Sequence, residues 1–164
     1  MNIHFDGLID GAILFEPEPI WDDRGYFAEV LRFAEGLSWV QQNITMNILA
    51  GTLRGLHYQE APHQETKLIR CIRGSIFDIQ IDLRPESSTY QEWSCVELSE
   101  KNMLALLVPR GVAHGYQTLE PNTQVFYQVS EHYHPESAKT IKWNDPKYDI
   151  KWPLPVSAIS EKDK

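Results

Sequence analysis

Two histidines, a lysine and a tyrosine are the residues whose types best suit acid–base chemistry. His57 lies in segment 51–59, which is expected to be extended and also contains Arg54. A neutral imidazole can accept a proton near pH 7, although a lone histidine in a strand is more often a hydrogen-bonded structural residue. Residues three apart on an ideal strand face opposite sides, but Gly55 can support a bulge that redirects one of them.

Lys67 and Tyr127 are the next two candidates. Lys67 precedes the apolar pair Leu68-Ile69, and Tyr127 lies in the mostly apolar segment 125–129. Taken alone, the lysine suggests a surface residue and the tyrosine a core residue. If both point into a barrel, the ammonium can stabilise a developing oxyanion and the phenol can deliver a proton.

His114 belongs to a Pro-x-Gly-x-x-His pattern that starts at Pro109. This spacing resembles the second half of the cupin signature, in which the histidine binds a metal. The first half requires His-x-His and a placed glutamate, whereas His57 is followed by a tyrosine and a glutamine. Because metal sites need several convergent ligands, we expect no catalytic metal. The sequence also lacks a Gly-x-Gly-x-x-Gly fingerprint, so no nicotinamide or flavin cofactor is expected.

The elements that must position these residues are expected to be short strands. In segment 75–83, apolar residues at 77, 79, 81 and 83 alternate with polar residues at 78, 80 and 82. This period of two predicts a half-buried strand. Further strands are expected at 51–58, 67–73, 93–98, 104–108, 115–119 and 123–129.

Scattered turn residues and the absence of repeats predict one all-β domain over residues 1–164. The strands fit either a sandwich or a barrel, and the motifs favour a cupin-type jelly-roll barrel with short peripheral helices. Segment 32–39 is the single weak helical candidate. The proline-containing segment 145–155 is expected to wrap the surface irregularly.

Composition narrows the classes of function. The formal net charge of −8 and the isoelectric point of about 5.2 argue against broad nucleic-acid binding, but not against a small anionic ligand held by a few arginines. No apolar stretch reaches the length of a membrane span, and the first residues do not resemble a signal peptide, so we expect a cytoplasmic protein. Cys71 and Cys95 are expected to be buried free thiols.

Several segments together resemble one known family. They are residues 23–29, 40–43, 51–59, 67–70, 82–84, 109–115, 143–146 and 160–163. Spread over nearly the whole chain, they are similar to the dTDP-4-dehydrorhamnose 3,5-epimerase family. The resemblance implies a cupin-type jelly roll, a sugar-nucleotide substrate, a reaction without metal, and a homodimer that exchanges N-terminal strands.

The resemblance also implies roles for single residues. His57 matches the catalytic base, Asp163 the carboxylate that orients it, and Tyr127 the acid on the opposite face of the sugar. Lys67 matches a residue near the ketone oxygen, and His114 a further active-site histidine. The residues that match ligand-binding positions are Arg54 and Gln41 for the diphosphate and nucleotide, Asn43 in the same site, and Arg24, Phe27 and Glu29 on a strand from the other subunit.

The implied chemistry is inversion of the carbons beside a ketone. A ketone at C4 of a dTDP-4-dehydro-6-deoxyhexose acidifies the hydrogens on C3 and C5, because removing either gives an enolate. Inversion then needs a base on one face, an acid on the other and a donor at the oxyanion. The alternatives are an epimerase that inverts only one centre, a metal-dependent cupin enzyme such as a dioxygenase, and a non-catalytic sugar-nucleotide-binding module.

Overall fold

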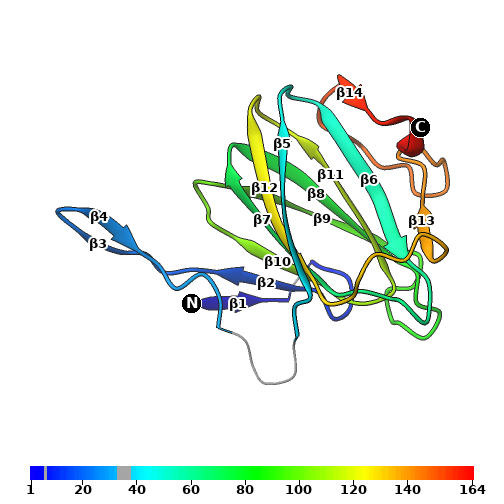
Figure 1. Ribbon diagram of the computed structural model, residues 1–164, viewed down its shortest axis with the longest axis horizontal. Helices are drawn as coiled ribbons and strands as arrows, with labels where there is room; N and C mark the ends of the chain where they lie inside the picture. The colour runs from blue at the N-terminus through cyan, green and yellow to red at the C-terminus, as the bar shows by residue number, and fades with distance from the viewer. Residues whose placement is uncertain (6, 33–37) are drawn as a thin grey trace.

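The computed structural model describes residues 1–5, 7–32 and 38–164, and these residues form two β-sheets packed face to face (Figure 1). The first sheet has the strand order β1-β2-β10-β7-β12-β5. Its strands are β1 (Asn2–His4), β2 (Ile13–Glu16), β5 (Gln41–Asn47), β7 (Lys67–Arg73), β10 (Ala105–Val108) and β12 (Thr123–Val129).

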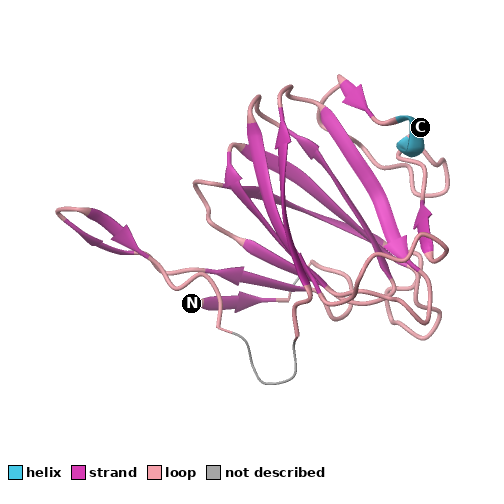
Figure 2. Ribbon diagram, in the orientation of Figure 1, coloured by secondary structure: helices cyan, strands magenta, loops and turns pink. Residues whose placement is uncertain are grey.

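The second sheet has the order β13-β6-β11-β8-β9, and β14 pairs with β6 outside this path. Its strands are β6 (Thr52–Gln59), β8 (Ser75–Asp82), β9 (Trp93–Ser99), β11 (Val112–Thr118), β13 (Ala138–Thr140) and β14 (Ala158–Ile159). The chain is thus the expected all-β jelly roll. In the described residues, helical structure is confined to one 3₁₀ turn, η1 (Glu161–Asp163), so the expected peripheral helices amount to this turn (Figure 2). The helical candidate 32–39 lies largely outside the described residues.

The main core fills the space between the two sheets. Ile69 and Val125 from the first sheet meet Ile76 and Tyr116 from the second, and all four are buried. The β-branched residues among them favour extended backbone, because their branched side chains pack well on a pleated surface. This core fixes the separation of the sheets and therefore the position of every side chain that points between them.

Strand β8 corrects one expectation. Its residues alternate as predicted, but Asp78, Gln80 and Asp82 are fully buried rather than exposed. The reason is that the apolar face, which carries Ile79 and Ile81, packs under the segment that follows β13, whereas the polar face lies on the inner side of the sheet with Ile76. The strand is therefore buried on both faces.

Strand β6 contains the irregularity that Gly55 made plausible. His57 pairs with His114 of β11, and Arg54 pairs with Tyr116, so three steps along β6 match two along β11. Gly55 has φ +112, and a Cβ atom there would lie 2.6 Å from Cα of Gly115. This left-handed conformation and close approach require glycine. The bulge turns both Arg54 and His57 toward the same side of the strand, where both line one cavity.

The C-terminal segment wraps the second sheet, as expected for residues 145–155. Trp152 donates its indole N–H to the carbonyl of Trp143 at 2.8 Å, and the Gln117 side chain exchanges two hydrogen bonds with the backbone of Leu154. The segment then returns as β14, which runs parallel to β6. It ends in η1 and so brings Asp163 over the inner side of β6.

A hairpin of β3 (Ile20–Asp22) and β4 (Gly25–Phe27) projects away from the barrel (Figure 1). It carries large apolar side chains in solvent, and Ile20, Trp21 and Phe27 are each about 70% exposed. Exposed apolar residues grouped in this way mark surfaces that contact another molecule.

The two cysteines differ, which corrects the expectation that both are buried. Cys71 is buried on β7, and burial raises the pKa of its thiol to about 11. Cys95 is exposed on β9, the last strand of the second sheet.

Candidate active site

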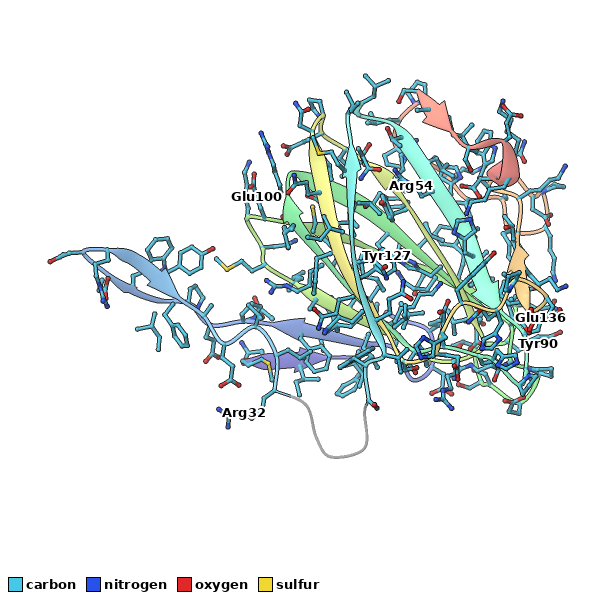
Figure 3. The ribbon with its side chains drawn as sticks, in the orientation of Figure 1. Arg32, Arg54, Tyr90, Glu100, Tyr127 and Glu136 are labelled. Atoms are coloured by element: carbon cyan, nitrogen blue, oxygen red, sulfur yellow. The ribbon has the colours of Figure 1, made fainter. Side chains whose placement is uncertain are left out.

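One cavity of about 380 Å³ opens between the two sheets. Its walls come from β5, β7 and β12 on one side and from β6 and β11 on the other, and the C-terminal segment closes part of its rim. Arg54 and Tyr127 lie between the sheets in Figure 3. The predicted residues that line it are Arg54, His57, Lys67, His114, Tyr127 and Asp163.

His57 is held by a carboxylate. Its Nε2 atom lies 2.6 Å from Oδ1 of Asp163, whose side chain is only 2% exposed. An ionised carboxylate only accepts hydrogen bonds, so Nε2 carries the proton and Nδ1 keeps its lone pair. Burial lowers the pKa of His57, although Asp163 acts in the opposite direction. The imidazole is therefore neutral near pH 7 and competent to accept a proton.

Asp163 is itself fixed in place. Its other oxygen, Oδ2, accepts a hydrogen bond from the backbone N–H of Gly55 at 3.4 Å. Burial by itself would raise the pKa of this carboxyl, but the hydrogen bond and charge of His57, together with hydrogen bonds from Ser160 and Gly55, outweigh burial and lower it. Asp163 is thus ionised at neutral pH.

His114 belongs to a second histidine–carboxylate pair. Its Nε2 atom lies 2.8 Å from Oδ2 of Asp78, a fully buried residue on the neighbouring strand β8. Gln80 donates to the other oxygen of Asp78 at 2.6 Å. Sequence patterning missed Asp78, because it placed the polar residues of β8 on the solvent side.

Lys67 is buried, with 8% of its surface exposed, in contrast to the usual surface lysine. Its ammonium donates to the backbone carbonyl of His57 at 3.0 Å and lies 3.1 Å from Oε1 of Glu65. These two contacts compensate the burial of the charge and hold it at the cavity wall. The ammonium is thus available to a ligand oxygen in the cavity.

Tyr127 enters the cavity from β12, which belongs to the sheet opposite His57. Burial raises the pKa of its phenol, with a smaller contribution from the charge of Glu65 and an opposing one from Arg54. The phenol is therefore protonated at neutral pH and able to donate. His57 and Tyr127 face the same space from two sides.

Arg54 is positioned by a chain of polar contacts. Its Nε atom donates to Oδ1 of Asn47 at 2.7 Å, and Asn47 donates to the carbonyl of Thr123 at 3.1 Å. The remaining guanidinium nitrogens have no partner of their own among the hydrogen bonds of the described residues. A guanidinium held by one edge presents its other donors to an anion, and phosphate oxygens match this geometry.

A second cavity of about 310 Å³ adjoins the first, because His57, Lys67 and Tyr127 line both. Gln41 and Asn43 line this second cavity, and the Gln41 amide donates to Oδ1 of Asn43 at 2.7 Å. Both residues project from β5, the last strand of the first sheet.

Three predicted binding residues lie away from these cavities in the single chain. Arg24 of the projecting hairpin is paired with Asp22, at 2.5 Å between Nη2 and Oδ2. Phe27 is 71% exposed on the same hairpin, and Glu29 pairs with Arg32, which Figure 3 labels far from Arg54 and Tyr127. Within one chain the structure does not bring this trio to the other site residues.

Lys162 is a cavity residue that the sequence did not single out. It lines both cavities and its charge acts to lower the pKa of His57. Its position directly before Asp163 could have predicted this, because a turn that places one residue at the cavity rim places its neighbour there too.

The place where a metal-binding cupin holds its ion carries a different set of side chains in this chain. His57 and His114 each contact one carboxylate, and in the described chain neither ring belongs to a group of three converging metal ligands. The residues present therefore do not fit the three-imidazole and glutamate set of a metal-binding cupin. No described helix has the length and apolar composition needed to cross a bilayer.

The jelly roll and the acid–base groups in its cavity define a class of protein, the jelly-roll epimerases of sugar nucleotides. A sequence model described as dTDP-4-dehydrorhamnose 3,5-epimerase matches residues 7–164. The chain belongs to this family.

Similar proteins carry the same description. A dTDP-4-dehydrorhamnose 3,5-epimerase of Methanothermobacter thermautotrophicus is 46% identical over 165 residues, which cover 95% of this chain and 88% of that protein. The crystal structure of such an enzyme from Bacillus anthracis, with TDP and PPi bound, has a TM-score of 0.89 and 41% identity over 93% of this chain and 91% of that one. A 3'-monoepimerase from Streptomyces bikiniensis, in complex with dTDP-quinovose, has a TM-score of 0.86 and 28% identity over 94% of this chain and 82% of that one.

Proposed function

We propose that this chain epimerises C3 and C5 of a dTDP-4-dehydro-6-deoxyhexose. His57 is the base, Tyr127 is the acid on the opposite face, and Lys67 stabilises the oxyanion at C4, while His114, held by Asp78, forms part of the cavity wall beside them. The observation that carries the proposal is that an imidazole and a phenol from opposite sheets line one cavity together with a buried ammonium.

Each step follows from the state of these groups. The neutral His57 removes the hydrogen beside the ketone, and the negative charge moves to the C4 oxygen. Lys67 donates to that oxygen, where a preorganised donor in a cavity stabilises charge better than water does. Tyr127 then protonates the carbon from the other face, and the centre is inverted. Asp163 keeps His57 in the tautomer whose Nδ1 is free.

The nucleotide is expected to anchor the sugar rather than react. Arg54 presents free guanidinium donors suited to a diphosphate, and Gln41 and Asn43 line the adjoining cavity. Binding energy from this remote part of the substrate holds the sugar between base and acid.

The test of the proposal is solvent-deuterium exchange with a dTDP-4-keto-6-deoxyglucose substrate. His57→Ala should abolish deuterium incorporation, and Tyr127→Phe should retain exchange but invert poorly. Exchange at the wild-type rate in His57→Ala would remove His57 from the role of base. Normal inversion by Tyr127→Phe would require another acid.

Inversion at a single centre is the second candidate, and the structural similarity to a 3'-monoepimerase favours it. One base and one acid serve either reaction, so the residues alone do not separate the two. Following deuterium separately at C3 and C5 does: incorporation at one carbon only would establish the single-centre reaction.

We further propose that the working form is a homodimer in which the β3–β4 hairpin reaches the partner's cavity. This proposal is supported by the exposed apolar side chains of the hairpin and by its distance from its own barrel. In such a dimer Arg24, Phe27 and Glu29 contact a nucleotide bound by the other chain.

Mixed dimers test this arrangement. Arg24→Ala should be weakly active at low substrate concentration, and His57→Ala should be inactive. When the two variants are co-expressed, a mixed dimer contains one site with both residues intact only if Arg24 acts across the dimer. Recovered activity is expected, and its absence, in dimers verified by mass, would place Arg24 outside the partner's site.

A further inference from the structure

Two loops at the rim of the barrel bring together a set of metal-binding side chains outside the acid–base site. His63 lies in the loop between β6 and β7, and Glu131 and His134 lie in the loop between β12 and β13. One ligand atom from each of the three lies within 4.8 Å of the other two. We propose that His63, Glu131 and His134 form a binding site for a divalent metal ion of the zinc class.

The backbone that carries these side chains is already fixed. Gln59 is only 3% exposed, and its amide donates to the carbonyls of His63 and His132, each at 3.0 Å. Its Oε1 atom accepts from the backbone N–H of His134 at 2.6 Å. One buried side chain therefore joins the two loops through three hydrogen bonds. Because the backbone is already ordered, ion binding does not lose free energy in ordering it.

A second set of contacts strengthens the junction. The N–H of Glu60 donates to the carbonyl of Ser137 at 2.9 Å, and the N–H of Thr66 donates to Oγ of Ser130 at 2.8 Å. The two ends of both loops are thus cross-linked. Outer contacts of this kind are what hold first-shell ligands of a metal site in register.

The side chains have the composition of a zinc-class site. Two imidazoles and one carboxylate suit Zn²⁺, Co²⁺ or Ni²⁺, whereas Mg²⁺ and Ca²⁺ prefer oxygen ligands alone. The Nε2 atom of His134 lies 3.8 Å from Glu131, and its Nδ1 atom lies 3.4 Å from Glu136, so negative charge is present on both sides of the ring. A water would complete the coordination of a bound ion, as in zinc sites with three protein ligands.

The geometry requires one local adjustment. The His63 and His134 rings are stacked, with centroids 3.5 Å apart and planes 13° apart, so their in-plane lone pairs run nearly parallel. For both rings to bind one ion, one ring must rotate about its Cβ–Cγ bond, a torsion that is broad for histidine. Metal binding should therefore end the ring stacking.

The site adjoins the second cavity but is separate from the proton-transfer groups. Glu131 lines that cavity, while His63 and His134 do not line either one. A bound ion would clamp the loop that leads directly into Lys67. The inference goes beyond the proposed function and does not depend on it.

Zinc and cobalt titrations of the untagged, metal-stripped full chain test the proposal. Calorimetry with Zn²⁺ should give one site per chain, and Co²⁺ should give visible absorption bands of a low-coordinate site. His63→Gln and His134→Gln should each lower zinc affinity by about tenfold or more, since even outer-shell changes have effects of this size.

His132→Gln is the matched control, because His132 shares the loop but is not among the three converging side chains. It should retain wild-type zinc affinity, and all variants should melt at the wild-type temperature without metal. Equal zinc affinity in wild type, His63→Gln and His134→Gln would overturn the proposal, as would an equal loss in His132→Gln or no binding by the wild type.

Discussion

The cavity contains two histidine–aspartate pairs that share a chemical composition but differ in how they are held. His57 and His114 are directly opposite on neighbouring strands. The His57 side chain is 34% exposed and its carboxylate partner lies in the C-terminal turn η1, whereas the His114 side chain is 10% exposed and its carboxylate partner lies on the same sheet.

The partners of the two carboxylates explain the difference. Asp78 is fixed by Gln80, whose Oε1 accepts from Ser94 at 2.8 Å, and Ser94 in turn accepts from the backbone of Ile9 at 3.3 Å. Asp163 rests on a 3₁₀ turn of three residues. A fully satisfied buried network is rigid. The accessible pair therefore suits proton transfer, and the closed pair suits a fixed wall of the cavity.

Substituting each of the two histidines in turn gives the largest expected effect. His57→Asn should lower kcat by about 10²- to 10⁴-fold, since a positioned base contributes that much, and should slow deuterium exchange by a similar factor. His114→Asn should lower kcat by about 10²-fold or less, the effect of a small displacement of the groups that position the sugar, with exchange slowed but still detectable. Stopped exchange in His114→Asn and normal exchange in His57→Asn would reverse the assignment of the two pairs.

Substituting each aspartate in turn should show that one pair mainly supports the stability of the fold and the other mainly supports activity. Asp78→Asn breaks a buried charged network and should lower the free energy of unfolding by about 1 to 3 kcal/mol. Asp163→Asn should lower kcat with a smaller loss of stability, because the terminal turn can shift to relieve an unsatisfied contact. Urea denaturation and steady-state kinetics on both variants check this. Equal destabilisation by the two changes would show that the pairs are held alike.

The pH dependence should identify the accessible pair as the base. Burial lowers the pKa of His57, so kcat/KM should rise with pH through an acid limb that lies below the ordinary histidine value of about 6.5. Burial raises the pKa of Tyr127, so activity should persist above the ordinary tyrosine value of about 10. Asp163 acts to raise the pKa of His57, and Asp163→Asn should therefore move the acid limb to lower pH. An unmoved limb would belong to another group.

Much of the strand framework was predictable because it depends on local patterns. Strands 67–73 and 123–129 have the predicted bounds, and the glycine at 55 correctly signalled the bulge that brings Arg54 and His57 together. Alternation on β8 was also correct, but alternation cannot say whether the polar face of a strand meets solvent or is itself covered. That depends on the distant segment that covers Ile79 and Ile81, and for this reason Asp78 was missed.

The grouping of His63, Glu131 and His134 at the rim could not be predicted from sequence patterns, for a related reason. His63 and His134 are brought together by loops from different strands, and neither loop has a periodic pattern. Likewise, nothing local indicates that the hairpin with Arg24 and Phe27 leaves its own barrel. The family resemblance supplied that expectation, because it implies a homodimer that exchanges N-terminal strands.

The smallest expected effect concerns the charge beside the accessible pair. Lys162 lines both cavities, and its charge acts to lower the pKa of His57. Lys162→Gln should therefore move the acid limb of kcat/KM to higher pH, by less than about one unit, because solvent and salt screen an exposed ammonium. Lys164→Gln is the matched control, since that lysine pairs with Glu161 and should leave the limb in place. The shift should shrink as salt is added. A shift of equal size in both variants would mean that net charge, not the position of Lys162, determines the pH of the acid limb. The distinction between an adjustable and a fixed histidine pair would then lose this support.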